Sequence, residues 1–213
     1  MLTHMGHSEK VLFMKRLLLI LILTFSFQSW TKADDIKDFE IGNFSLNESL
    51  LNYYSKKNLM SNWDDQKIGY GFKSDKYYKF AFFGSEFNPY DHVVLYTLRS
   101  DNKFIIKSIT GFRSNLEIKK CYKEMKIIAK EINEMFPNSK QDNYGPVIKP
   151  LDPSGKSTEK GILFILVNGS VAGISCIDYS KEYLKKYNWE SDHMQIFLDT
   201  KEYNKWLRDE AWQ

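Results

Sequence analysis

Apolar side chains recur every third or fourth residue between Ile118 and Met135, a spacing that gives a helix one apolar face. Pro137 and Asn138 follow directly, and both residue types end helices. The preceding Ser114–Glu117 segment has the Ser-x-x-Glu form of a capping box. The sequence therefore predicts an amphipathic helix that packs against a sheet. Its expected buried stripe is Ile118, Cys121, Met125, Ile128, Ile132 and Met135.

Strands are predicted where short runs are rich in aromatic and β-branched residues and are bounded by turn residues. The clearest turn is Asn168-Gly169, which is typical of a two-residue hairpin. Because the connections between neighbouring strands are short, we expect antiparallel pairing. The predicted strands are Tyr77–Phe83, Val93–Leu98, Phe104–Thr110, Ile162–Val167, Ser170–Tyr179 and Met194–Leu198.

Two more helices and one long loop complete the expected order of elements. A second capping box, Ser45–Glu48, predicts a helix from about Leu46 to Lys56, and Thr200 is suited to cap a C-terminal helix. The segment Asn138–Lys160 is rich in Pro, Asp, Ser and Gly and predicts a surface loop. Runs of adjacent strands separated by single helices predict an α+β fold, an antiparallel sheet with helices packed mainly on one face.

The N-terminal part of the sequence has the three features of a secretory signal peptide. Met14-Lys15-Arg16 supplies the basic start, Leu17–Phe27 the apolar stretch and Ala33 the small residue before cleavage. That stretch is 11 residues long, whereas a bilayer span needs about 20. We expect translation to start at Met14, with residues 1–13 an upstream extension. Cleavage near Ala33 would leave a single domain of residues 34–213, periplasmic or secreted, with no membrane span.

The net charge of the chain is +3, from 30 Lys and Arg against 27 Asp and Glu. Residues 1–33 hold four of these basic residues and one of the acidic residues, so 26 of each remain in the expected mature protein. A surface that binds nucleic acid requires a basic stripe or patch. Since the remaining charge is balanced and its lysines are scattered, we expect no nucleic-acid partner.

The chain contains two cysteines, Cys121 in the predicted long helix and Cys176 in a predicted strand. Disulfides persist in oxidising compartments such as the periplasm. We therefore favour a disulfide between these two residues, with a pair of buried free thiols as the alternative. In the chain-entropy model, a bridge over this interval stabilises the fold by about 4 kcal/mol.

Other motifs with chemical meaning are incomplete. Ser154–Thr158 contains the Gly-Lys-Ser ending of a phosphate loop, but Pro150 occupies the position of the first glycine that the motif requires. The expected mature chain has two histidines, His92 and His193, and their spacing matches no metal-binding motif. We therefore expect no cofactor and no metal site, and assign no catalytic residue.

Aromatic and charged residues supply the candidates for a binding surface. Trp189, His193 and Trp206 gather near the C-terminus, while Arg99 and Arg113 end adjacent predicted strands and are candidates for holding an anion. The alternatives are that the tryptophans belong to the core and that the arginines are ordinary surface charges.

Several segments of the expected mature chain resemble one group of exported proteins. These segments are Asp34–Gly42, Ser45–Leu51, Ile174–Ser180 and the tail around Trp206. They resemble small exported proteins of unknown function from Pelagibacter-like marine alphaproteobacteria. A weaker likeness is to small outer-membrane assembly lipoproteins of the SmpA/OmlA type. The resemblance implies an exported helix-plus-sheet module and carries no activity.

Three functions remain open on the sequence. The first, which we favour, is a periplasmic or secreted module that binds a small ligand or an envelope protein. The second is a small envelope hydrolase with a site around Glu86, Asp91 and His92. The third is a purely structural accessory protein of the envelope.

Overall fold

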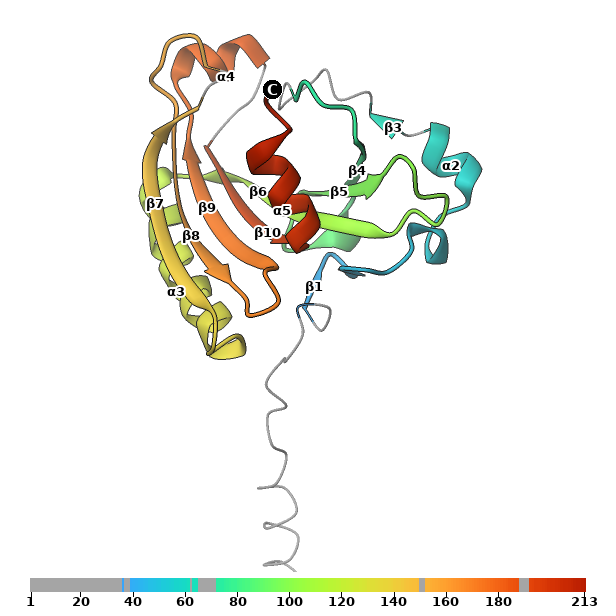
Figure 1. Ribbon diagram of the computed structural model, residues 1–213. Helices are drawn as coiled ribbons and strands as arrows, with labels where there is room; N and C mark the ends of the chain where they lie inside the picture. Colours follow the sequence, from blue (N-terminus) through green and yellow to red (C-terminus); the bar gives the residue numbers. More distant parts are fainter. Residues whose placement is uncertain (1–35, 37–38, 62, 65–71, 150–151, 188–191) are drawn as a thin grey trace, which may run out of the picture. The chain divides into compact units, whose positions relative to one another are not determined.

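Eight strands form one antiparallel sheet (Figure 1). The computed structural model describes residues 36, 39–61, 63–64, 72–149, 152–187 and 192–213, which lie within one compact unit, Ala33–Gln213. The α+β class and the antiparallel sheet are confirmed. In spatial order the strands are β3 (Trp63–Asp64), β4 (Tyr77–Phe83), β5 (His92–Leu98), β6 (Ile106–Leu116), β10 (Asp192–Asp199), β9 (Val171–Asp178), β8 (Thr158–Ile165) and β7 (Lys140–Ile148).

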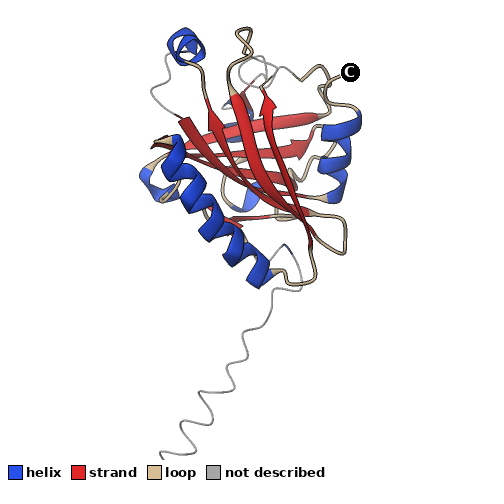
Figure 2. Cartoon of the chain, turned by 90° about the vertical axis from the view of Figure 1, so that its left-hand side faces the viewer, coloured by secondary structure: helices blue, strands red, loops and turns tan. Residues whose placement is uncertain are grey.

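The two longest helices lie on opposite faces of this sheet (Figure 2). The predicted amphipathic helix is α3 (Ile118–Met135), and it packs on β8, β9 and β10. The C-terminal helix is α5 (Lys201–Asp209), which contacts β6 and β10. Figure 1 shows α5 in front of the sheet and α3 behind it. Thus α3 covers one face as expected, whereas α5 takes the other.

The face under α3 carries the larger part of the core. The helix buries Cys121, Met125 and Ile132 against the strands, with Met194 and Cys176 among their partners. Each large apolar side chain removed from water contributes roughly 1.5–3 kcal/mol. The stripe predicted from the sequence therefore holds α3 on the sheet.

The opposite face, which we call the pocket face, has a smaller aromatic core. Side chains alternate between the faces of a strand. Val94 and Tyr96 of β5 therefore belong to this aromatic core, whereas their neighbours Val93 and Leu95 belong to the larger core on the other face. Helix α5 adds buried residues of its own to this face. The aromatic core is Tyr77, Val94, Tyr96, Phe112, Tyr203, Trp206 and Ala211.

The predicted N-terminal helix over Leu46–Lys56 is wrong. The segment instead contains the 3-10 turn η2 (Leu50–Asn52), and the short helix α2 (Lys56–Ser61) begins only at its last residue. A hairpin of β1 (Glu40–Ile41) and β2 (Phe44–Ser45) precedes it. Backbone groups of this segment bond to the chain just before β6, for example Leu50 N–H to the Phe104 carbonyl at 3.0 Å. Such tertiary pairing replaces the bonds that a helix would make.

The predicted surface loop Asn138–Lys160 is also wrong over most of its length. Strand β7 occupies its first part and pairs with β8 as the sheet's edge. The register of the β7–β8 pairing shifts once, between Tyr144 and Val147, the two residues that flank Gly145-Pro146. An edge strand tolerates proline and polar residues because one side of its backbone faces solvent. This exposure explains why β7 has the composition of a loop.

Two helix starts differ in how well they were predicted. Thr200 caps α5 as expected, with its hydroxyl accepting from the Tyr203 N–H at 3.3 Å. Ser114 does not cap α3, because β6 continues to Leu116 and the Ser114 N–H bonds to the Asp91 carboxylate.

The remaining short elements are α4 (Lys181–Tyr187) and the 3-10 turn η3 (Ser85–Phe87). Within the described residues, no helix is long and apolar enough to cross a membrane.

Candidate functional site

A pocket of about 170 Å³ lies on the pocket face, where β5, β6 and β10 meet α5 and the C-terminal tail. Its walls are mostly aromatic, and Trp212, which is 45% exposed, lies at its rim. For scale, an engineered apolar cavity of about 150 Å³ binds benzene. The lining residues are Phe72, Val94, Tyr96, Ser108, Thr110, Phe112, Lys149, Phe197, Asp199, Tyr203, Leu207 and Trp212.

Strand alternation explains why these side chains converge. Ser108, Thr110 and Phe112 are successive residues on one face of β6, and Phe197 and Asp199 have the same relation on β10. The two strands are paired so that Asp199 lies opposite Ser108 and Phe197 opposite Thr110. The pocket therefore has aromatic walls and a polar patch at the end of β10.

Asp199 is the most unusual residue of the pocket because its carboxyl is only 4% exposed. Burial raises the pKa of Asp199 to about 7, and a hydrogen bond from Ser108 acts against this rise. Among the described residues, no Lys or Arg forms an ion pair with it. A carboxyl without a paired cation in such a place is a candidate for binding or proton exchange.

Lys149 brings a positive charge to the same pocket, but this charge is already neutralised. Its Nζ lies 2.6 Å from Oε2 of Glu159, and the Tyr144 hydroxyl donates to Oε1 of Glu159 at 2.7 Å. Burial alone would raise the pKa of Glu159, but Lys149 and the hydrogen bonds outweigh it and keep that pKa below its usual value. Lys149 and Glu159 therefore add no net charge to the pocket.

His92 and His193 share the other end of the pocket face. Burial lowers the pKa of both, that of His92 to about 4 with a further contribution from His193. The His92 ring is stacked on Phe112, with centroids 4.4 Å apart, and on Phe83 at 4.9 Å. A ring enclosed by two aromatic rings is poorly placed for general base catalysis. Glu86, from the predicted hydrolase site, is exposed.

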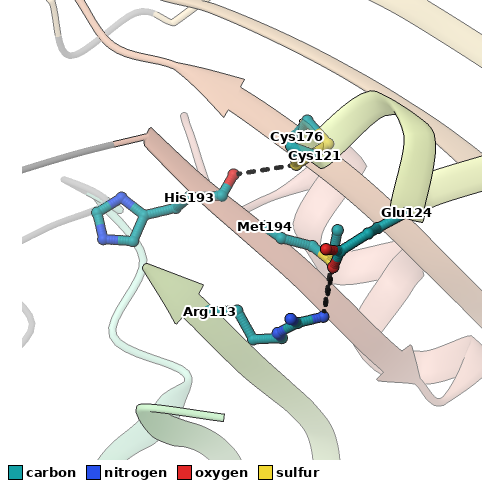
Figure 3. Close-up of a disulfide and its surroundings, with 6 residues drawn as sticks. All are labelled: Arg113, Cys121, Glu124, Cys176, His193 and Met194. Carbon is teal, nitrogen blue, oxygen red and sulfur yellow. Dashed lines mark hydrogen bonds and ion pairs between the residues drawn. A yellow bond between two sulfur atoms is a disulfide. The ribbon is translucent and has the colours of Figure 1, made fainter. Parts of the chain in front are cut away.

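The predicted disulfide between Cys121 and Cys176 is present, with Cα atoms 6.0 Å apart. Figure 3 shows it between α3 and the sheet, with the His193 ring pointing away from it. The Sγ atom of Cys121 lies 4.0 Å from the His193 carbonyl oxygen. A disulfide sulfur has no proton to donate, so this is a packing contact. His193 therefore has its backbone beside the disulfide and its ring on the pocket face.

Arg99 and Arg113 do not form a common anion site. Because β5 and β6 are antiparallel, residues near the C-terminal ends of the two strands lie at opposite ends of the sheet. Arg113 donates to Glu124 of α3 at 2.8 Å (Figure 3), and Arg99 lies 3.5 Å from Asp75. Each guanidinium thus has a carboxylate of its own.

The three aromatic residues near the C-terminus that were candidates for a binding surface do not lie together in one site. Trp206 is fully buried in the aromatic core, where its Nε1 donates to the Ser74 hydroxyl at 2.9 Å. Trp189 lies outside the described residues. His193 is half-buried, with its ring 5.3 Å from that of Tyr179. Trp206 therefore supports the pocket from behind and does not line it.

The Gly-Lys-Ser segment is held by the chain's own carboxylate. Asp152 accepts hydrogen bonds from the backbone N–H and hydroxyl groups of both Ser154 and Ser157, at 2.6–2.9 Å. These bonds outweigh the effect of burial and lower the pKa of Asp152. The donors that would hold a phosphate are thus used within the loop. In the described part of the chain, no three His, Cys, Asp or Glu side chains gather to hold a metal ion.

The chain was compared with protein-family models, with curated proteins and with solved structures. None of the three comparisons found a match. The function must therefore be argued from the pocket and from the chemistry of its lining.

The pocket residues were not predicted from the sequence, Asp199 above all. The predicted strand ends at Leu198, one residue before Asp199. A signal was present in the alternation of Gln195, Phe197 and Asp199, which puts a buried acid on the same face as an aromatic residue. Extending that alternation by one residue would have identified Asp199.

Proposed function

We propose that this protein is an exported binding protein whose ligand site is the pocket on the pocket face. One observation carries the proposal. An aromatic-walled pocket of about 170 Å³ also contains a buried carboxyl that forms no ion pair with a described Lys or Arg. Apolar concave sites with a few convergent polar groups are the usual form of small-molecule sites.

Export is supported by two independent features. The segment Met14–Ala33 has the order of parts found in secretory signal peptides. The Cys121–Cys176 disulfide suits an oxidising compartment such as the periplasm or the cell exterior. Expression of the full chain followed by N-terminal sequencing tests this part. We expect a mature protein that begins at Asp34, and a mature protein retaining Leu17–Phe27 would contradict it.

The volume of the pocket limits the ligand to about the size of one aromatic ring. Its walls offer aromatic faces from several elements, including Tyr96 of β5, Phe197 of β10 and Tyr203 of α5. Aromatic walls favour flat or branched apolar groups. We therefore expect small ligands with one polar or charged group directed at Asp199.

Binding is tested by titrating the processed protein with a panel of ring-sized compounds. Trp212 at the rim and Trp206 behind the wall give fluorescence that responds to occupancy, and calorimetry measures the affinity. Thr110→Phe fills the pocket from the centre of β6, so it should weaken binding at least tenfold, which corresponds to about 1.4 kcal/mol. The matched control is Asn143→Phe on the exposed edge strand β7, which should bind as the wild type does.

Failure to bind any member of the panel would count against a small-molecule site. Binding that survives Thr110→Phe would place the ligand elsewhere on the protein. Circular dichroism of both variants shows whether the fold is retained. The hydrolase alternative receives no support from the geometry, since the His92 ring is stacked between Phe83 and Phe112.

A further inference from the structure

We infer that the pocket selects small organic ammonium ions, with Asp199 as the counter-ion and the aromatic walls as a cation-binding cage. This inference rests on the proposed function, because it names the chemical class of ligand for the same pocket. It is carried by the charge balance around Asp199, by its burial and by the composition of the walls.

Among the described residues, Asp199 is the uncompensated charge of the site. Lys149 is neutralised by Glu159 at 2.6 Å. On the adjoining elements β6 and α5, Lys107 lies 3.6 Å from Glu202. An ionised Asp199 would therefore leave the pocket with a net negative charge that the described residues around it do not balance.

The other described elements that surround Asp199 bring no group that strongly opposes its charge. On β9, its pairing partner is Val171, an apolar residue. On α5, Lys201 is exposed and lies beside Gly169 in the β8–β9 turn. The titratable groups that line the pocket with Asp199 are Tyr96, Lys149 and Tyr203.

Burial alone makes the ionised form of the Asp199 carboxyl unfavourable. Asp199 is 4% exposed, and burial raises its pKa to about 7. Near neutral pH the group is therefore close to the point where half of the molecules are ionised. A bound cation would stabilise the ionised form, so cation binding and proton release are coupled.

The walls of the pocket suit a cation better than they suit a neutral polar ligand. The faces of Tyr, Trp and Phe rings attract quaternary and other ammonium groups within about 6 Å of the ring centroid. Six aromatic residues line the pocket together with the single buried acid. They are Phe72, Tyr96, Phe112, Phe197, Tyr203 and Trp212.

The test uses two probes of the same shape and different charge, phenyltrimethylammonium and tert-butylbenzene. The processed wild type should bind the cation at least tenfold more tightly than the neutral probe. Asp199→Asn keeps the size of the side chain and removes its charge. This variant should lose at least tenfold in affinity for the cation and keep its affinity for the neutral probe within twofold. Retained binding of the neutral probe also shows that the variant is folded.

Asp142→Asn is the matched control, since it makes the same change of charge on the exposed edge strand β7, outside the pocket. It should keep the preference for the cation. A second measurement needs no variant. Calorimetry of the wild type at pH 7 in two buffers of different ionisation enthalpy should show proton release on cation binding.

The outcomes separate the two proposals. Equal binding of both probes or unchanged cation binding by Asp199→Asn would overturn the ammonium selectivity and leave the pocket as a ligand site. Absence of proton release would overturn the coupling between cation binding and the Asp199 proton. Binding of neither probe, together with failure of the wider panel, would overturn the proposed function itself.

Discussion

The disulfide between Cys121 and Cys176 joins the apolar stripe of α3 to strand β9, on the face of the sheet opposite the pocket. The two residues are 55 positions apart in the sequence. The bond therefore closes a long loop that includes β7 and β8. It supports the sheet from behind and makes no direct contribution to the pocket lining.

Removal of this disulfide should lower stability and spare the pocket. For Cys121→Ala/Cys176→Ala, we expect the free energy of unfolding to fall by about 4 kcal/mol, because the unfolded chain regains the entropy of the open loop. Guanidinium denaturation measures the change. Dithiothreitol should destabilise the wild type and leave the double variant unaffected. A double variant as stable as the wild type would contradict the prediction.

Asp199 should make the protein less stable as the pH rises. Its pKa is about 7 in the folded state against 3.8 for an unperturbed aspartate, so between these values the folded protein holds a proton that the unfolded chain has lost. The resulting stabilisation is fully present below about pH 4. The free energy of unfolding then falls by at most about 4 kcal/mol as the pH rises through 7. Asp199→Asn should abolish this fall. Urea denaturation from pH 4 to 8 measures it, with exposed Asp142→Asn as the control.

His92 should have the opposite effect over nearly the same range. Its pKa is about 4 in the folded state against 6.5 for an unperturbed histidine, so the unfolded chain takes up a proton first and stability is lost as the pH falls from 6.5 towards 4. This contribution amounts to at most about 3 kcal/mol. His92→Phe, which keeps a ring between Phe83 and Phe112, should remove the acid sensitivity.

The two effects partly cancel in the wild type between pH 4 and 6.5. We therefore expect a flatter pH profile of stability for the wild type than for either single variant. The double variant Asp199→Asn/His92→Phe should restore the flatness. Single-variant profiles parallel to that of the wild type would show that neither group titrates as described.

Gly173 sets the position of the Phe197 wall of the pocket. A Cβ atom at Gly173 would lie 2.3 Å from the Phe197 ring, so the ring must move towards the pocket in Gly173→Ala. We expect a loss of stability of about 1–3 kcal/mol from overpacking, together with weaker ligand binding. Addition of Phe197→Leu should recover part of the stability. Thermal denaturation and calorimetry check both effects, and a Gly173→Ala protein with unchanged melting temperature would contradict the argument.

Much of the local structure could be predicted from the sequence because it depends on neighbouring residues. The stripe of α3, the strand Tyr77–Phe83 and the Thr200 cap each follow from residue type and spacing over a few positions. A turn is also present at Asn168-Gly169, but its hairpin loop has three residues, Val167–Gly169, and not the predicted two. The cysteine pairing followed from the expected compartment and from the presence of two cysteines.

The errors occur where distant segments decide the outcome. The segment Leu46–Lys56 has helical spacing, but its backbone bonds to the residues before β6. β7 has the composition of a loop, and only its pairing with β8 makes it a strand. Arg99 and Arg113 are separated because adjacent strands run in opposite directions.

The sequence by itself determined the fold class, the amphipathic helix and the expectation of an oxidising compartment, since composition and short periodicities carry that information. Only the tertiary structure decided that Asp199 is buried, that Lys149 is neutralised by Glu159 and that aromatic residues from four separate parts of the chain surround one pocket. The physical reason is that burial and pairing of charge depend on what the folded chain brings next to each group, which no local pattern records.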